Sequence, residues 1–315
     1  MNKKKCPNCQ SAKTKKNGQR KGVQLYKCIT CGHQFRAGYP IRNQALWDEY
    51  LNGKQTIKEL SQTYGVSESS IKRKLCKITL EWRQPDLTTM SGFVHLDVTY
   101  WGHNWGVLLA LDHETNMPLY LAFIKSETTS DYKLAVDAIV KAGYTIRGII
   151  IDGKRALFEE FREYPLQMCH FHMYQIVERY LTKNPRMIAS RELLAMCDMM
   201  YYVDEEIFLE DYNAWKSRYS GFLNKRTTHK DGRTYYLHRK LRTAVNSIEF
   251  YLPYLYTYQR EEQDGMPNTN NKIEGAFTDL KKNLNNHSGM SIENRKRFIS
   301  GYFMDKLYHY LIGRF

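Results

Sequence analysis

The sequence has 315 residues, of which 42% are hydrophobic and 13% aromatic, and its formal net charge is +14. This apolar content excludes a disordered protein, and no apolar run approaches the roughly 18 residues that a membrane span requires. The N-terminus lacks the apolar stretch of a secretory signal, so we expect a folded cytoplasmic protein with no membrane partner. Its seven cysteines should then stay reduced and serve as metal ligands rather than form disulfides.

The positive charge is confined to the first part of the chain. Residues 1 to 83 hold 18 Lys and Arg against 5 Asp and Glu, whereas the remaining 232 residues hold 29 against 28. A basic block interleaved with Tyr26, Phe35, Tyr39 and Trp47 is typical of a nucleic-acid-binding region. The alternative is a solvated basic surface without a partner, but the sharp asymmetry favours nucleic acid.

Residues 1 to 38 carry the spacing of a structural zinc site. Cys6 and Cys9 form one C-x2-C pair, and Cys28 and Cys31 form a second pair after eighteen intervening residues. Four thiolates close a tetrahedron around Zn²⁺ and leave no open position, so such a site folds the segment and does not catalyse. Because the segment is too short for a core of its own, zinc would supply most of its folding free energy. We therefore predict a zinc ribbon with one structural Zn²⁺.

Residues 40 to 83 follow a helix-turn-helix pattern. Thr56 and Glu59 predict a capping box at the start of one helix, and Gly65 predicts a tight turn, after which Ser67 can cap a second helix. An ordinary helical hairpin is the alternative, but the neighbouring basic zinc ribbon favours DNA binding. The outer face of the second helix carries groups that bond to base edges and phosphates, namely Ser69, Ser70, Lys72, Arg73, Lys74 and Lys77.

After a predicted linker at residues 84 to 91, the pattern changes to that of an α/β domain. Strand-like, β-rich runs alternate with turn residues and are followed by one segment of helical period. This order predicts an antiparallel meander, a helix and a further buried strand in one mixed sheet. The strands are expected at residues 93 to 100, 106 to 111, 119 to 124 and 146 to 151, and the helix at residues 128 to 143.

Three acidic residues stand where a carboxylate is costly. Asp97 lies inside an apolar strand and Asp152 ends another, and such carboxylates usually bind a cation or are bonded by a turn. For Asp152 the following Gly153 makes a turn a real alternative. Glu274 borders the apolar stripe of a later helix, although an acid in a first turn is more often a surface residue stabilised by the helix dipole. Only the combination of the three favours a common site.

The residues around these acids resemble a known family. The runs HLDVTYWG, GIIIDG, CHFH and TNNKIEGAFTDLKKNLNNHSG are similar to those of the DDE transposases of bacterial insertion sequences, in particular the Mutator-like type with an RNase H-like core. The resemblance covers residues 92 to 315. The zinc ribbon and helix-turn-helix match the regions with which some of these transposases bind the ends of their element.

The resemblance implies a fold and a set of site residues. The core would comprise residues 92 to 172 and the C-terminal helices of residues 266 to 315, with an all-helical insertion at residues 173 to 265 between them. Asp97, Asp152 and Glu274 would form the catalytic triad. Cys169 and His172 match the C-x2-H signature of the family, and since two ligands alone do not make a zinc site, we expect them to have a packing and hydrogen-bonding role.

The implied chemistry uses two divalent cations, Mg²⁺ or alternatively Mn²⁺, held by the three carboxylates with Asp97 as the bridging ligand. The same site would hydrolyse DNA at the element end and join the freed 3′-hydroxyl to target DNA. The partners would be the terminal inverted repeats, target DNA and further copies of the chain, as a homodimer or higher oligomer in the synaptic complex on the bacterial nucleoid. Lys154, Arg155 and Asn270 are predicted to contact this DNA.

Two other functions remain open from the sequence alone. The protein could be a DNA-binding regulator or domesticated transposase that no longer cuts, although three intact acids count against this. It could also be an RNase H-like nuclease that cleaves without strand transfer, which the end-binding region makes less attractive.

Overall fold

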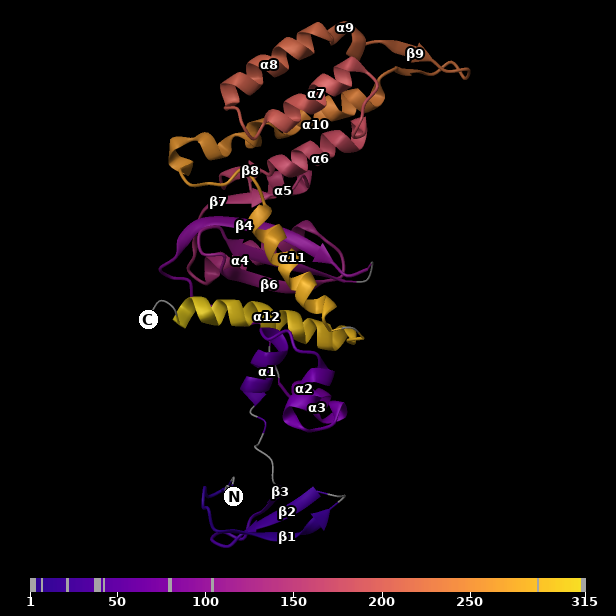
Figure 1. Cartoon of the computed structure of the whole chain (residues 1–315). Helices are drawn as coiled ribbons and strands as arrows, with labels where there is room; N and C mark the ends of the chain where they lie inside the picture. Colours follow the sequence, from indigo (N-terminus) through magenta and orange to yellow (C-terminus); the bar gives the residue numbers. More distant parts are fainter. Residues whose placement is uncertain are drawn as a thin grey trace. The chain divides into compact units, whose positions relative to one another are not determined.

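The computed structural model describes residues 4–6, 8–20, 23–36, 41, 43–78, 81–102, 105–287 and 289–312. Tyr39, one of the aromatics in the basic block, lies outside this set. The chain divides into two compact units, Met1–Thr79 and Leu80–Phe315, coloured indigo to violet and violet to yellow in Figure 1. Among the described helices, none combines the length and apolar character needed to cross a bilayer.

The first unit begins with a small antiparallel sheet of three strands, β1 (Thr14–Arg20), β2 (Val23–Cys28) and β3 (Gln34–Arg36). Tyr26 and Phe35 are cross-strand partners, and their rings stack with centroids 6.0 Å apart. Such cross-strand aromatic pairs stabilise a sheet that has little apolar surface of its own. Among the side chains of this sheet whose burial the structure describes, only that of Cys28 is buried.

Three helices complete the first unit: α1 (Asn43–Leu51), α2 (Ile57–Tyr64) and α3 (Glu68–Leu75). The predicted caps are confirmed, since Thr56 and Glu59 form a reciprocal capping box on α2 and the Ser67 side chain accepts from the backbone N–H of Ser70 at the start of α3. Gly65 ends α2 with a φ of 61°, a left-handed conformation that glycine adopts without strain.

The second unit is built on a five-stranded mixed sheet in the order β6-β5-β4-β7-β8. β4 pairs antiparallel with β5 and β5 with β6, whereas β7 lies parallel to both β4 and β8. The predicted meander, helix and buried strand are confirmed, and β8 is an additional strand. Their bounds are β4 (Ser91–Tyr100), β5 (Gly106–Asp112), β6 (Pro118–Ile124), α4 (Thr129–Lys141), β7 (Thr145–Ile151) and β8 (Leu166–Met168).

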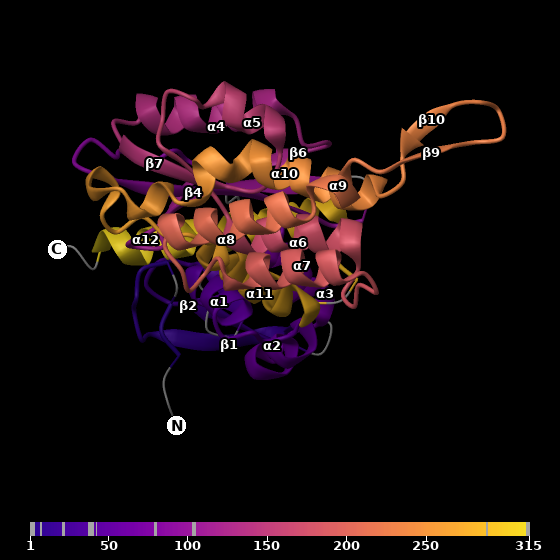
Figure 2. The ribbon, with the colours of Figure 1, turned by 90° about the horizontal axis from the view of Figure 1, so that it is seen from above.

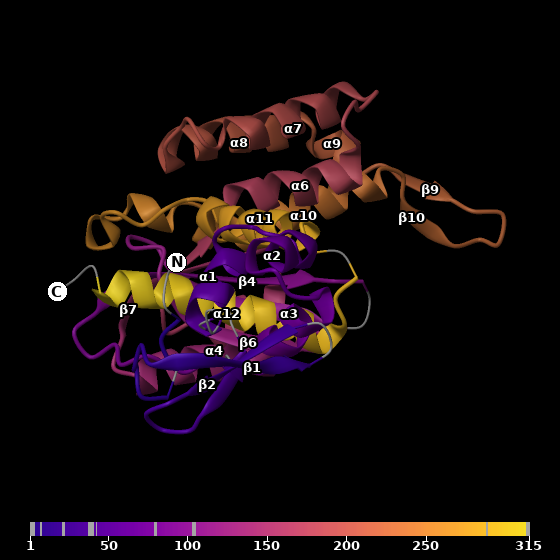
Figure 3. The same cartoon turned by 60° about the horizontal axis from the view of Figure 1, so that its bottom comes forward.

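Helices cover both faces of this sheet. In Figure 2, α4 and α5 lie on one side of the strands and α11 and α12 on the other, so the apolar strands are buried in the middle layer. Between β8 and α11 the chain builds a separate helical layer from α6, α7, α8 and α10 (Figure 3). These helices are α5 (Arg155–Glu160), α6 (His170–Leu181), α7 (Ile188–Met199), α8 (Glu205–Arg218), α9 (Ser220–Leu223), α10 (Arg239–Leu255), α11 (Asn271–Asn285) and α12 (Ile292–Ile312), with short 3₁₀ turns at Thr257–Gln259 and Glu261–Gln263.

The prediction that the insertion is all-helical is wrong at one place. A two-stranded antiparallel hairpin, β9 (Arg226–Thr228) and β10 (Thr234–Tyr236), interrupts the helices. Its strands consist largely of threonine and tyrosine, which favour β structure, and the intervening turn contains Asp231 and Gly232, the latter with a φ of 82°. An Asp-Gly pair between β-forming residues is a hairpin signal, and the helical periodicity on either side hid it.

Candidate active site

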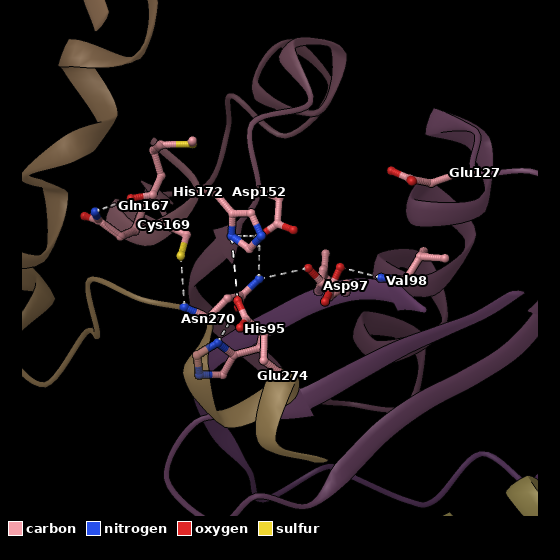
Figure 4. A network of polar contacts seen from close by, with 12 residues as sticks. His95, Asp97, Val98, Glu127, Asp152, Gln167, Cys169, His172, Asn270 and Glu274 are labelled. Atoms are coloured by element: carbon pink, nitrogen blue, oxygen red, sulfur yellow. Dashed lines mark hydrogen bonds and ion pairs between the residues drawn. The ribbon is translucent and has the colours of Figure 1, made fainter. Parts of the chain in front are cut away.

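The three predicted acids come from separate elements and meet at one edge of the sheet (Figure 4). Asp97 lies on β4, Asp152 directly follows β7, and Glu274 is in the first turn of α11. β4 and β7 are parallel neighbours with His95 paired to Ile150, so a step of two residues along each strand brings Asp97 beside Asp152. The register of the sheet thus converts two distant sequence positions into one cluster.

The electrostatics of this cluster are unfavourable to negative charge. Burial, followed by the nearby Asp152 carboxylate, raises the pKa of Asp97 well above its ordinary value. Burial also raises the pKa of Glu274, an effect that His172 opposes and Asp152 reinforces. Carboxyl groups that repel one another in a desolvated place favour a proton or a cation among them.

His172, in the first turn of α6, lies against two of the acids. Its Nδ1 atom is 2.9 Å from Asp152 Oδ1 and 3.8 Å from Glu274 Oε1. Burial alone would lower its pKa, but the contacts with Asp152 and Cys169 outweigh burial and raise the pKa of His172 to about 11. These contacts therefore favour the protonated form of the imidazole between the two carboxylates.

A buried polar relay that the sequence analysis missed fixes Asp152. The Asn270 amide donates to Asp152 Oδ1 at 3.0 Å and to the Leu96 carbonyl at 3.4 Å. Its oxygen lies 2.6 Å from His95 Nδ1, and His95 Nε2 lies 3.0 Å from His113 Nδ1. His95 and Asn270 are fully buried, and burial lowers the pKa of His95 to about 4, so a neutral His95 donates to Asn270 and accepts from His113.

Cys169 joins the two ends of the insertion beside the site. It follows β8, whose Met168 pairs with Ile151, and its own N–H donates to the Ile151 carbonyl at 3.1 Å. Its sulfur accepts from the Asn270 N–H at 3.3 Å, while the His170 N–H donates to the Asn268 carbonyl at 2.9 Å. Asp152, Cys169 and His172 offer ligand atoms that all lie within 4.8 Å of one another. The geometry gives Cys169 a hydrogen-bonding partner that the sequence did not indicate.

A cavity of about 530 Å³ opens beside these acids. Glu127, another acid that the sequence analysis did not select, lies on its wall and accepts from the Lys154 ammonium group at 3.3 Å and from the Tyr132 hydroxyl at 3.0 Å. Lys154 thus faces the cavity, whereas the guanidinium of Arg155 lies 4.5 Å above the Phe250 ring in the helical layer. The residues that line the cavity include Asp97, Asp152, Glu127, Lys154, His172 and Arg179.

The carboxylate oxygens of the cluster are of the type that binds divalent cations, although, among the described residues, the three acids do not form a group whose ligand atoms all lie within 4.8 Å of one another. Glu274 Oε1 is buried and, among the described residues, accepts no hydrogen bond, and the bond described for the Asp97 carboxylate comes from its neighbour Val98 at 2.7 Å. Carboxylate oxygens that keep acceptor capacity are ligands that Mg²⁺ and Mn²⁺ prefer. The three carboxylates would hold the cations, with Asn270 and His95 fixing the orientation of Asp152 from behind.

In the first unit, the four predicted cysteines form a second ligand cluster. The ligand atoms of Cys6, Cys9, Cys28 and Cys31 all lie within 4.8 Å of one another. Two sulfur pairs are 3.6 and 3.5 Å apart, close to the roughly 3.8 Å edge of a tetrahedron with Zn–S bonds of about 2.3 Å. The donor set fits one Zn²⁺ with no open position.

The predicted DNA-facing residues of α3 divide into two groups. Ser70, Arg73, Lys74 and Lys77 surround a hollow of about 460 Å³ together with Asn43 and Val66. Ser69 and Lys72 are exposed outside this hollow. In the other unit, Asn270 is buried and engaged with Asp152, so its side chain acts on the acids.

Comparison with known proteins gives little beyond this geometry. No family model matches the chain, and no curated protein matches it. Two similar solved structures are a simian T-cell lymphotropic virus intasome in complex with PP2A regulatory subunit B56 gamma and a Drosophila P element transposase strand transfer complex. The intasome chain is 10% identical to this chain with a TM-score of 0.21, and the match covers 62% of this chain and 60% of the intasome chain. The P element transposase is 11% identical with a TM-score of 0.34, and the match covers 90% of this chain and 82% of the transposase chain. The chain thus spans 60% of the length of the intasome chain, and neither likeness is close enough to support a function.

Proposed function

We propose that the chain is a DDE-type DNA transposase of the Mutator-like kind, which cleaves DNA at the ends of its insertion element and joins the ends to target DNA. The observation that carries this proposal is the meeting of Asp97, Asp152 and Glu274, of which Asp97 and Asp152 line a cavity. The three acids come from two adjacent parallel strands and a later helix, and they are desolvated and repel one another. Such an arrangement does not stabilise a fold, but it suits the binding of cations and phosphates.

The chain's own residues would act in three ways. Asp97 would contact both cations, while Asp152 and Glu274 would each hold one. Asn270 would keep one oxygen of Asp152 turned toward the site, because its amide bonds the other oxygen, Oδ1. When bound, the two cations activate the attacking oxygen and stabilise the leaving oxygen of a phosphodiester. On cation binding, the His172 side chain would move away from its position between Asp152 and Glu274.

The first unit supplies a means of holding the element ends. Its four-cysteine cluster would bind zinc and fix the ribbon, and the basic hollow on α3 would contact phosphates and base edges. Both steps of transposition need paired ends, so we include a homodimer or higher oligomer in the proposal.

The test is a cleavage and joining assay on paired element-end DNA with Mg²⁺ or Mn²⁺. Asp97→Asn, Asp152→Asn and Glu274→Gln should each abolish both cleavage and the joining of a pre-cut end, while binding to the end persists. Glu163→Gln, which neutralises an exposed acid of the same unit, is the matched control and should stay active. Cutting without joining would instead indicate a nuclease, and wild-type binding without either step would indicate a regulator.

A further inference from the structure

A second basic surface lies in the unit that carries the acids. We define the hairpin arm as residues 225–242, which comprise β9, β10, their turn and the first turn of α10. In Figures 2 and 3 the strands of this arm project from the end of the helical layer, away from the sheet. The arm is the place where the insertion departs from its helical pattern.

The arm concentrates the positive charge of its surroundings. It contains seven Lys and Arg against one Asp, whereas the rest of residues 84–315 holds 22 against 27. The near-neutral net charge of residues 84–315 is therefore the sum of a strongly basic arm and an acidic remainder. Among the described residues, only Arg233 of these seven lies within ion-pairing distance of a carboxylate, that of Asp231.

Stacking on tyrosines holds several of these cations in fixed positions. The guanidinium groups of Arg226 and Arg242 lie 4.7 and 3.7 Å from the Tyr236 ring, and Arg239 lies 4.7 Å from the Tyr235 ring. Arg226 also donates to the Tyr236 hydroxyl at 3.2 Å, and Arg242 Nη1 donates to the Leu223 carbonyl and to Asn224 Oδ1 at 3.2 and 3.0 Å. A guanidinium has five N–H donors, so those that remain can still bond an anion such as phosphate. Preorganised cations lose less side-chain entropy on binding than flexible ones do.

The arm has no apolar face that would explain it as a packing element or as a dock for an apolar partner. Both strands are exposed or half-buried along their length, and an isolated two-stranded hairpin is only marginally stable in water. Its tip is ordered locally, since the Arg233 N–H donates to Asp231 Oδ1 at 3.0 Å. A ribbon of two strands has the width of the DNA major groove, and its cations complement phosphates on either side.

We infer that the hairpin arm is a DNA-binding surface of the catalytic unit, separate from the ribbon and α3, and that it contacts the phosphates of duplex DNA. The inference deepens the proposed function, on which it rests for the choice of DNA as the polyanion. It would place a contact on the substrate at a point of the unit distinct from the acids.

The test uses the full chain carrying Asp97→Asn, so that binding is measured without cleavage. Lys225→Gln, Lys230→Gln and Lys240→Gln together remove three exposed charges that none of the described carboxylates pairs with. The Kd for a short duplex, with and without an element end, should rise, and the salt slope of log K should fall by roughly 0.9 for each lost phosphate contact. The matched control removes the same charge elsewhere on the unit through Lys141→Gln, Arg162→Gln and Lys183→Gln, all exposed, and should leave both values unchanged.

A triple Lys→Arg variant at positions 225, 230 and 240 should retain the wild-type slope, because it preserves the charge. An unchanged slope in the Gln variant would overturn the inference. So would unchanged DNA binding with altered self-association, which would assign the arm to an acidic surface of a second copy. A wild-type chain that fails to cut while the arm effect persists would count against the proposed function alone, and active cutting with no arm effect would count against the arm alone.

Discussion

The cysteine cluster of the first unit and the carboxylate cluster of the second both bring together metal-ligand atoms from distant sequence positions. The two clusters differ in whether they leave room for anything besides a metal ion. The four sulfurs face one another at 3.5 to 3.6 Å in two pairs, so a single ion fills the space between them. Asp97 and Asp152 instead line a cavity of about 530 Å³, which leaves room for a larger group. A closed site stabilises a fold, whereas an open site can exchange its contents.

The surroundings of the two clusters also differ in how much apolar surface they bury. The cysteine cluster lies beside a small sheet with few buried residues. Asp97 and Asp152 instead lie on and directly after strands of a large apolar sheet, and His172 lies against Asp152 and Glu274. Removing a ligand should therefore unfold the ribbon of the first unit but only inactivate the second unit.

The largest effect is expected at the cysteines. Cys28→Ser should release zinc and unfold the ribbon, since structural zinc contributes on the order of 10 kcal/mol to the folding of such small domains. Metal analysis should give one zinc per wild-type chain and none per variant, while amide exchange in β4 and β5 stays protected. Cys76→Ser, outside the cluster, is the control; equal zinc in both variants would exclude the four-cysteine site.

Substitutions of two aspartates on the same sheet should distinguish a residue needed for activity from one needed for stability. Asp112 is buried and accepts from the Thr115 N–H at 2.8 Å, the Thr115 hydroxyl at 2.6 Å and the Tyr144 hydroxyl. Asp112→Asn should therefore destabilise the second unit by about 1 to 3 kcal/mol and leave the chemistry intact. Asp97→Asn should abolish the chemistry and stabilise the metal-free unit, as measured by urea unfolding.

The pH dependence sharpens this contrast. Because the pKa of Asp97 is raised in the folded chain above its ordinary value of 3.8, the wild type loses stability as the pH rises through the interval between the two values. Asp97→Asn should remove this loss in cation-free buffer. A variant less stable than wild type at neutral pH would mean that the Asp97 charge is satisfied within the chain.

The relay behind Asp152 should have an intermediate effect. Asn270→Ala removes the amide bond to Asp152 and leaves the buried His95 without its partner, so we expect activity to fall by about 10- to 100-fold and the Mg²⁺ requirement to rise. Asn268→Ala keeps the carbonyl that bonds the His170 N–H and should be nearly silent. A loss of activity with an unchanged Mg²⁺ titration would assign Asn270 a role in folding alone.

The smallest effect is expected on the basic hollow of α3. Arg73→Gln with Lys77→Gln should lower the salt slope of DNA binding by about 1.8, which is roughly 0.9 for each phosphate contact. Lys54→Gln with Lys58→Gln removes the same charge from exposed positions outside the hollow. Equal slopes for the two pairs would show that α3 does not face the DNA.

Local signals explain what could be predicted from the sequence. The Thr56 cap, the Gly65 turn, the four strands from β4 to β7 and the spacing of the cysteines each depend on residues close together in the chain. The meeting of Asp97 with Asp152 also follows once two parallel strands are assumed. Each of these patterns contains its own physical cause.

The remaining features depend on partners that no local pattern indicates. The strand period places His95 on the same face as Asp97, but only the closed fold shows that it bonds Asn270, 175 positions away. Cys169 meets the Asn270 N–H across 101 positions. The hairpin arm was missed for another reason, because long helices on both sides outweighed a short β signal.

The contacts of Cys169 and His170 with Asn270 and Asn268 have a consequence for how the protein can change. They place the points where the chain leaves the core and returns to it side by side. The base of the helical layer also packs on the core, because Tyr251 donates to the Gly153 carbonyl at 2.5 Å and both parts share one hydrophobic cluster. The strands β9 and β10 of the hairpin arm lie outside that cluster, so they can change in length or sequence without moving the strands that carry the acids.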